Sequence, residues 1–356
     1  MSVLNRLYYV VVSVISPRTK PYARLLFRVL STLWEGLPER QRGLATVATP
    51  LEANPLLPLG KRDYWDSVYA TWASIIHDGV YWRMYYSGKD KLGYLRIGLS
   101  FSEDGLNWTK HRSNPILDVG PAGAWDALHV YCPIVWKEKA SWKMIFTGCD
   151  SRNNMHFQVG LAESQDGISW TKFKGNPVFN SRNSWDLNRF QKHETEGWGL
   201  LINHSRYYLF YNPVTRLPRQ VGVASSQDLI SWESLFPHPI VPTEGFPWEL
   251  GYMKYCAWPF KFGKYTYLLA SVSDAIYTKS KIGLWRLVGS LPSVEGIEFL
   301  GYILGTAAEW CKREVDTPFL VSDVSSGRLL CYYGGRSIRN EWAEGVALID
   351  MEELVE

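Results

Sequence analysis

One phrase recurs along this chain at a nearly constant interval, and it restricts the fold more than any other feature. The dipeptides that begin at Asn54, Asn114 and Asn176 are all Asn-Pro and stand 60 and 62 residues apart, and His238-Pro239 marks a degraded fourth copy. Each copy is followed about ten residues later by a tryptophan and an acid. These pairs are Trp65-Asp66, Trp125-Asp126, Trp185-Asp186 and Trp248-Glu249. A fixed period of this length, filled with strands and turns, indicates a radial β-repeat.

The second unit shows the expected strands most clearly. Runs of β-branched and aromatic residues, cut by Gly, Asp and Asn turns, predict strands over 131–136, 142–147, 159–163 and 169–172. Four strands in about 60 residues correspond to one propeller blade. We therefore predict an all-β fold, a five-bladed β-propeller.

The expected blades cover 54–113, 114–175, 176–237, 238–300 and the stretch from about 301 onward. The last blade lacks a good fourth strand, and we expect 45–50 to supply it and close the ring. The propeller domain thus spans 45–356. Residues 1–44 are predicted to be an amphipathic helical extension, because Arg24 and Arg28 lie one helical turn apart in the largely apolar stretch 22–30. The apolar run 7–15 has nine residues and is too short to cross a bilayer. We expect this extension to pack on the propeller or a partner, with peripheral membrane contact as the alternative.

Composition excludes several classes of function. The net charge of +3 is too small to argue for nucleic-acid binding. The five cysteines are odd in number and show no CxxC spacing, so neither a disulfide framework nor a zinc site is indicated, and we expect a cytoplasmic protein. No nucleotide-binding or metalloprotease motif occurs, so we expect no cofactor and no catalytic metal. The 17 Trp and 21 Tyr suit packing between blades, and some suit stacking on sugars.

The Asn-Pro and Trp-Asp openings, with Ser-x-Asp-Gly-x-x-Trp-x-Lys endings at 102–110 and 164–172, resemble five-bladed propeller glycosidases. These are glycoside hydrolase family 43, the invertase and levansucrase relatives and the mannoside phosphorylases. The resemblance covers about 45–350. It implies a carbohydrate-active enzyme with three carboxylates at the axial mouth, on the innermost strands of the first three blades. One Asp acts as base, a second Asp tunes the acid, and a Glu in an EGP-like motif is the general acid.

The resemblance transfers to Glu196, because Glu196-Gly197-Trp198 stands where the family has EGP. The register follows from Met84, Met144 and Leu209 on the second strands, which aligns Pro133 with Ala73 and Trp198. We therefore expect Glu196 to be the general acid. The corresponding stretches 69–73 and 129–133 hold no carboxylate, so the family's base and second Asp are absent from their usual places.

Two residues are candidates for the missing base. Asp66 lies just before the first inner strand, but its Trp-Asp pair repeats, and a repeated Asp is expected to cap a turn. Asp316, with Glu314 two residues earlier, lies in blade five and would face blade three across the mouth; otherwise it caps a turn. Both candidates stay open at this point.

The stretch His193-Glu194-Thr195-Glu196 is not repeated, and strand alternation places Glu194 and Glu196 on one face. Two like charges there would raise the pKa of one of them, as a general acid requires, and the alternative is a solvated loop with a salt bridge. Further residues are expected to bind substrate by hydrogen bonds, stacking or charge: His193, Glu194, His129, Tyr131, Lys254, Tyr255, Glu314, Trp198 and Arg152. With Arg216 and Arg219, Arg152 follows a second strand and would hold phosphate or an acidic sugar.

The predicted function is therefore glycosidic-bond cleavage by carboxylate acid/base catalysis in the axial cavity, on a carbohydrate or glycoconjugate substrate. Alternatives are a glycoside phosphorylase or transferase, and a non-catalytic glycan-binding or biosynthetic propeller.

Overall fold

The computed structural model describes residues 48–350, apart from 153–155, 188–191, 204, 215–218, 242–252, 274–279, 307 and 324–327. The predicted N-terminal extension, 1–44, lies outside these residues. Within them, no helix has the length and hydropathy that a bilayer span requires. The five cysteines are free and buried.

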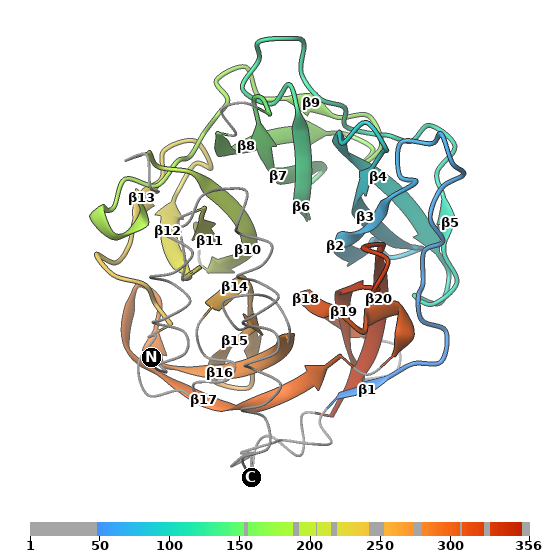
Figure 1. Ribbon diagram of the computed structural model, residues 1–356. Helices are drawn as coiled ribbons and strands as arrows, with labels where there is room; N and C mark the ends of the chain where they lie inside the picture. Colours follow the sequence, from blue (N-terminus) through green and yellow to red (C-terminus); the bar gives the residue numbers. More distant parts are fainter. Residues whose placement is uncertain are drawn as a thin grey trace, which may run out of the picture.

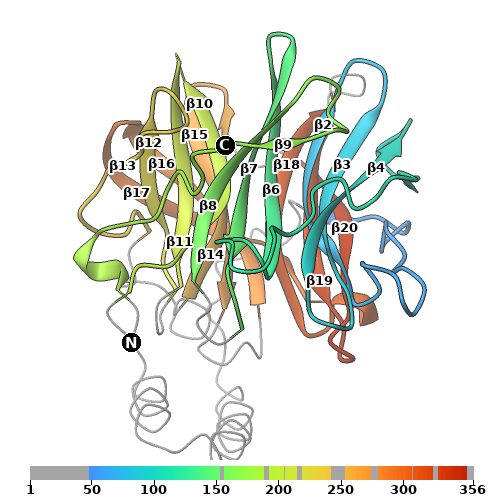
Figure 2. The same cartoon turned by 90° about the horizontal axis from the view of Figure 1, so that it is seen from above.

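Five four-stranded antiparallel blades stand around a central axis, as Figure 1 shows, and the fold is the predicted five-bladed propeller. Short parallel pairings between neighbouring blades join blades five, one and two into one 12-stranded sheet, whereas blades three and four are separate four-stranded sheets. Seen from the side in Figure 2, the blades stand next to one another around the ring. Blade one is β2 (Tyr69–His77), β3 (Trp82–Lys89), β4 (Leu95–Ser102) and β5 (Thr109–Lys110). Blade two is β6 (His129–Glu138), β7 (Ser141–Cys149), β8 (Phe157–Ser164) and β9 (Thr171–Lys172). Blade three is β10 (Thr195–Asn203), β11 (Arg206–Pro213), β12 (Gly222–Ser226) and β13 (Glu233–Ser234).

Blade four is β14 (Met253–Phe262), β15 (Tyr265–Ser273), β16 (Ser280–Ser290) and β17 (Ser293–Gly305). Blade five is β18 (Glu314–Asp323), β19 (Arg328–Arg336), β20 (Trp342–Ile349) and β1 (Ala48–Pro50). Two 3-10 turns, Ser184–Asp186 and Glu309–Cys311, precede blades three and five. The predicted start of blade five near 301 was too early, because the β16–β17 hairpin continues to Gly305 through three register shifts.

The predicted closure of the ring is confirmed. Strand β1 pairs antiparallel with β20, with Ala48 opposite Ile349, so the segment before the first blade completes the last one. Pairing of the first strand with the last blade leaves no open edge at this junction.

The asparagine of each Asn-Pro repeat clamps the third strand of the preceding blade. The Asn114 side chain accepts a hydrogen bond from the N–H of Leu99 (2.8 Å) and donates one to its carbonyl (2.9 Å). Asn176 does the same to Leu161, and Asn54 to Val346. The side-chain amide therefore replaces one residue of a further strand, which explains why the repeat needs asparagine.

The tryptophans of the first two Trp-Asp pairs pack across their own blades. Trp65 lies on Gly88 and Gly98, where an added Cβ would approach the ring to 2.2 and 2.5 Å. Trp125 covers the matching glycines of blade two, and Trp310 does so in blade five. These aromatic residues are scaffold, as their repetition predicts.

The Asp-Gly turns are also structural, as predicted. The Asp166 carboxylate accepts hydrogen bonds from the N–H groups of Ile168 and Ser169, both at 2.7 Å. These bonds outweigh desolvation and lower the pKa of Asp166 to about 2.

Each innermost strand carries a bulge at the same level, where its pairing register shifts. In four blades the first bulged residue has a left-handed φ of 47–55°: Trp72, Cys132, Cys256 and Thr317. A side chain of the preceding blade holds the bulge, as when Ser87 Oγ accepts a hydrogen bond from the Cys132 N–H at 3.0 Å. Thr147, Asn212 and Ser271 do the same for blades three, four and five. This repeated bond fixes the inner strands relative to one another, and so fixes the axial site.

Candidate active site

The residue just before the bulge is the key position of each innermost strand. The strand pairings make five residues equivalent there: Thr71, Tyr131, Glu196, Tyr255 and Asp316. The same registers confirm the predicted alignment of Ala73, Pro133 and Trp198. Blades three and five thus place an acid at the same level of the axis, with Glu194 and Glu314 two residues before them.

Glu196 is held by a hydroxyl and a guanidinium. Tyr131 Oη donates to Glu196 Oε1 at 2.5 Å, and Arg219 Nη1 lies 3.1 Å from Oε2. The acid is only 6% exposed. A hydroxyl and a guanidinium thus bind the two oxygens of this carboxyl group, one on each side.

Asp316 has the opposite environment. Burial raises its pKa well above the ordinary value, and the charges of Glu314 and Glu344 raise it further against a hydrogen bond from Thr317. Burial also raises the pKa of Glu314, but Arg336 at 3.3 Å and the Tyr255 hydroxyl at 2.8 Å both stabilise its charge. The proton of this pair therefore resides on Asp316.

Glu196 and Asp316 lie near the same region of the axis, because both influence the same two buried thiols, those of Cys132 and Cys256. Burial raises the pKa of each thiol, and the two carboxyl groups raise it further. Beside them, the bulged residues line a cavity of about 20 Å³, room for one water. Trp198 lies in this wall, edge-on to Trp72 with ring centroids 6.2 Å apart.

Asp66, the other candidate for the base, does not lie in this cluster. Its carboxylate is buried, pairs with Lys110 Nζ at 2.5 Å on the outermost strand β5, and accepts a hydrogen bond from Tyr86 at 3.0 Å. Asp126 pairs with Lys172 in the same way. The expected turn cap was wrong in detail, because the partners are side chains that tie the Trp-Asp loop to the outer strand.

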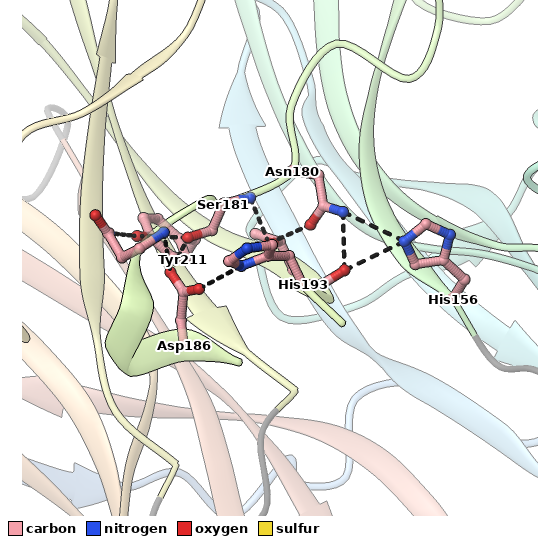
Figure 3. Close-up of polar contacts among 8 residues, drawn as sticks. His156, Asn180, Ser181, Asp186, His193 and Tyr211 are labelled. Carbon is pink, nitrogen blue, oxygen red and sulfur yellow. Dashed lines mark hydrogen bonds and ion pairs between the residues drawn. The ribbon is translucent and has the colours of Figure 1, made fainter. Parts of the chain in front are cut away.

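Blade three replaces this lysine pair with a histidine. Ser234 stands where Lys110 and Lys172 stand, and Asp186 Oδ1 instead meets His193 Nδ1 at 2.7 Å. Figure 3 shows the two side chains pointing toward each other. One ring nitrogen of His193 is therefore occupied by its contact with Asp186. Glu194, the next residue, is nearly buried ahead of β10.

The remaining predicted contacts fall in two places. Tyr131 and Tyr255 are the hydroxyl donors to Glu196 and Glu314 already described. His129 and Arg152 lie apart from them, on the wall of an open pocket of about 480 Å³ between blades one and two. Burial, then the charges of Lys89 and Arg152, lower the pKa of His129 to about 4. Lys254 lies on β14, opposite Val272, and its side chain is outside the part of the chain that the structure describes.

Sequence reasoning missed Glu344. It is fully buried on β20, its Oε2 accepts a hydrogen bond from Thr71 at 3.2 Å, and burial raises its pKa to about 8. At the equivalent position the other blades have Ile or Val before a glycine, at 97, 159, 221 and 282. An acid at this position of the repeat was therefore a signal that the sequence contained. Gly334 leaves room for Asp316 and Thr71, since an added Cβ would come within 2.6 Å of Asp316 Oδ1 and 2.8 Å of Thr71 Oγ1.

The comparisons with known proteins agree with this architecture. The model of glycoside hydrolase family 130, described as beta-1,4-mannooligosaccharide phosphorylase, matches residues 77–250, a little under half of the chain. A glycosyl hydrolase from Bacteroides ovatus shares the fold with a TM-score of 0.61 at 16% identity, over 89% of this chain and 96% of that one. No curated protein matches the sequence.

Two further structures share the fold. One is described by the words "The GH130 family of mannoside phosphorylases contains glycoside hydrolases that target beta-1,2 mannosidic linkages in Candida mannan"; its TM-score is 0.62 at 15% identity, over 89% and 96% of the two chains. A thermostable family-43 glycoside hydrolase has a TM-score of 0.56 at 14% identity, over 78% and 88%. The fold is that of the glycoside hydrolase-like five-bladed propellers. The family-level similarity is to family 130 and not specifically to family 43.

Proposed function

We propose that the protein is a carbohydrate-active enzyme that cleaves a glycosidic bond at the axial site, with Asp316 as proton donor and Glu196 as the opposing carboxylate. The observation that carries the proposal is the contrast between these two acids at equivalent strand positions. Asp316 is buried beside other acids, which raise its pKa, whereas Glu196 is ion-paired with Arg219. Two carboxyl groups with separated protonation states are what acid/base cleavage of a glycoside requires.

In this mechanism Asp316 protonates the glycosidic oxygen as the bond to the leaving sugar breaks. Glu196 removes a proton from the attacking water, and Arg219 and Tyr131 keep it charged until that step. Glu314 holds a negative charge two residues from the acid and so keeps the proton on Asp316. These assignments exchange the acid and base functions expected from the EGP-like motif.

Phosphorolysis is the second candidate, because the family model that matches is described as a phosphorylase. Phosphate would then replace water as the attacking group, and the product would be a sugar 1-phosphate. Arg219, which already contacts Glu196, is the described cation best placed to hold it there.

Turnover assays test the proposal directly. The protein would be incubated with β-1,4- and β-1,2-linked manno-oligosaccharides and with oligosaccharides that contain uronic acids, each with and without phosphate. We expect cleavage of one class, and a loss on the order of 10²–10⁴-fold in Asp316→Asn and in Glu196→Gln. Glu163→Gln, which removes a half-exposed carboxylate far along β8, is the matched control. Full turnover by either axial variant would refute the assignment.

A further inference from the structure

The open pocket between blades one and two has an unusual charge. Lys89, Lys91 and Arg152 line it, together with a single carboxylate, that of Asp90. Asp90 is committed elsewhere, since it meets Arg96 Nη1 at 2.7 Å and accepts a hydrogen bond from the Tyr94 N–H at 2.9 Å. The wall therefore presents three cations and almost no opposing charge.

None of these three cations has an ion pair with any carboxylate of the described residues. The Lys89 ammonium lies 4.7 Å from the centre of the Tyr69 ring. Arg152 donates a hydrogen bond to the carbonyl of Leu92 and lies over the Tyr94 ring. By contrast, Arg83, Lys110 and Lys172 of the same two blades are each paired with a carboxylate. An unneutralised group of cations in a concavity is an electrostatic cost that a bound anion would remove.

The repulsion is visible in the neighbouring groups. Burial lowers the pKa of Lys89, the nearby Asp90 partly opposes this effect, and the charge of Arg152 lowers the pKa further. The same two cations and burial keep His129 neutral at pH 7, so its imidazole can donate or accept a hydrogen bond without adding charge.

The pocket adjoins the axial acids but is separated from them by two aromatic residues. Tyr69 faces Lys89 on one side, and its pKa responds to Glu314, Asp316 and Arg336 on the other. Tyr131 contacts His129 with ring centroids 6.1 Å apart and donates to Glu196. A group in the pocket is therefore a neighbour of the reacting bond rather than the group that attacks it.

We propose that this pocket is a subsite for an anionic substituent of the glycan, such as the carboxylate of a uronic acid or a sugar-linked phosphate or sulfate, held by Arg152, Lys89 and Lys91. This inference rests on the proposed function and narrows its substrate class to acidic glycans. The volume of about 480 Å³ is in the range of small-ligand pockets and accommodates a sugar ring. Arginine binds planar carboxylates with two parallel hydrogen bonds, and the lysines add charge.

Binding of simple probes tests the subsite without requiring turnover. The full chain would be titrated, by ligand-observed NMR and thermal shift, with methyl hexuronides, the corresponding neutral methyl hexosides, a hexose 6-phosphate and inorganic phosphate. The acidic sugars are expected to bind at least about tenfold more tightly than the neutral ones, and Arg152→Gln and the triple variant Lys89→Met, Lys91→Met, Arg152→Gln to abolish that preference. Arg286→Gln, on the outer part of blade four, is the charge-matched control.

The outcomes separate this inference from the proposed function. Equal binding of acidic and neutral sugars, or an unchanged preference in the triple variant, would overturn the subsite. Inorganic phosphate that occupies the pocket and drives cleavage would also overturn it, since the pocket would then serve the second substrate of a phosphorylase. An acidic-sugar preference that survives in Glu196→Gln supports the subsite, even in a protein that shows no cleavage.

Discussion

Tyr131 on the innermost strand of blade two donates a hydrogen bond across the blade boundary to Glu196 on the innermost strand of blade three, with Oη and Oε1 2.5 Å apart. Blade four repeats the relationship, because Tyr255 Oη donates to Glu314 of blade five at 2.8 Å. A tyrosine therefore precedes each acidic strand around the ring. Each acid that is held charged depends on a hydroxyl from the blade before it.

Tyr131→Phe removes this donor while it keeps the packed ring. We expect kcat to fall about tenfold, because Glu196 loses one of the two groups that stabilise its charge. Arg219→Met should cost more, and its combination with Tyr131→Phe should cost less than the product of the single effects, since both act through one carboxylate. Steady-state kinetics on the cleaved substrate measures this. Multiplicative effects would show that the two residues act separately.

The pH–rate profile reports the proton on Asp316. Because the pKa of Asp316 is raised, its protonated form persists to a higher pH than that of an ordinary aspartate, and kcat/KM should fall on the alkaline side as that proton is lost. Glu314→Gln removes the neighbouring negative charge, which lowers the pKa of Asp316 and moves the alkaline limb roughly one unit toward lower pH. Glu163→Gln should leave the limb in place. If the alkaline limb did not move in Glu314→Gln, the group that titrates there would not be Asp316.

Glu344 links stability to pH. Its pKa of about 8 in the folded protein exceeds the ordinary value of 4.5, so the folded state holds a proton that the unfolded state releases. The free energy of unfolding should therefore decrease as pH rises from about 4.5 to about 8. Glu344→Gln should remove a decrease on the order of 4 kcal/mol between pH 5 and 8, measured by urea unfolding. Parallel pH dependences in variant and wild type would contradict this.

The buried pair of Asp66 and Lys110 should support stability and not catalysis. Asp66→Asn leaves Lys110 without its partner and should lower the free energy of unfolding by on the order of 3 kcal/mol. A double-mutant cycle with Lys110→Met should give a coupling of about 2 kcal/mol, with kcat and KM unchanged. A selective loss of kcat in folded Asp66→Asn would restore Asp66 as a candidate base.

The scaffold could be predicted from sequence because its contacts repeat. Asn114 and Trp125 make the same contacts that Asn54 and Trp65 make in another part of the ring. Because the same contact is required in each blade, the same residue type recurs in the sequence. The function of an acid could not be predicted in this way. Glu196 and Asp316 were both found, but their protonation depends on Tyr131, Arg219 and other neighbours that the sequence places tens of residues away.

Glu344 and the cationic pocket show the same limit. Glu344 reaches Thr71 only because the ring brings β20 beside β2. Lys89 and Arg152 follow the second strands of two different blades, and only the arrangement of those blades places them on one wall.

The cytoplasmic location remains a prediction.

The pairing of β1 with β20 has a consequence for how the molecule matures. The strand made first has to wait, during synthesis, until almost 300 further residues have left the ribosome before it finds its partner. Asp316 and Glu314 emerge with that last blade. A nascent chain therefore cannot place Asp316 and Glu314 in the ring until translation is nearly finished. Under the proposed function, the protein would become catalytically active only at the end of its synthesis.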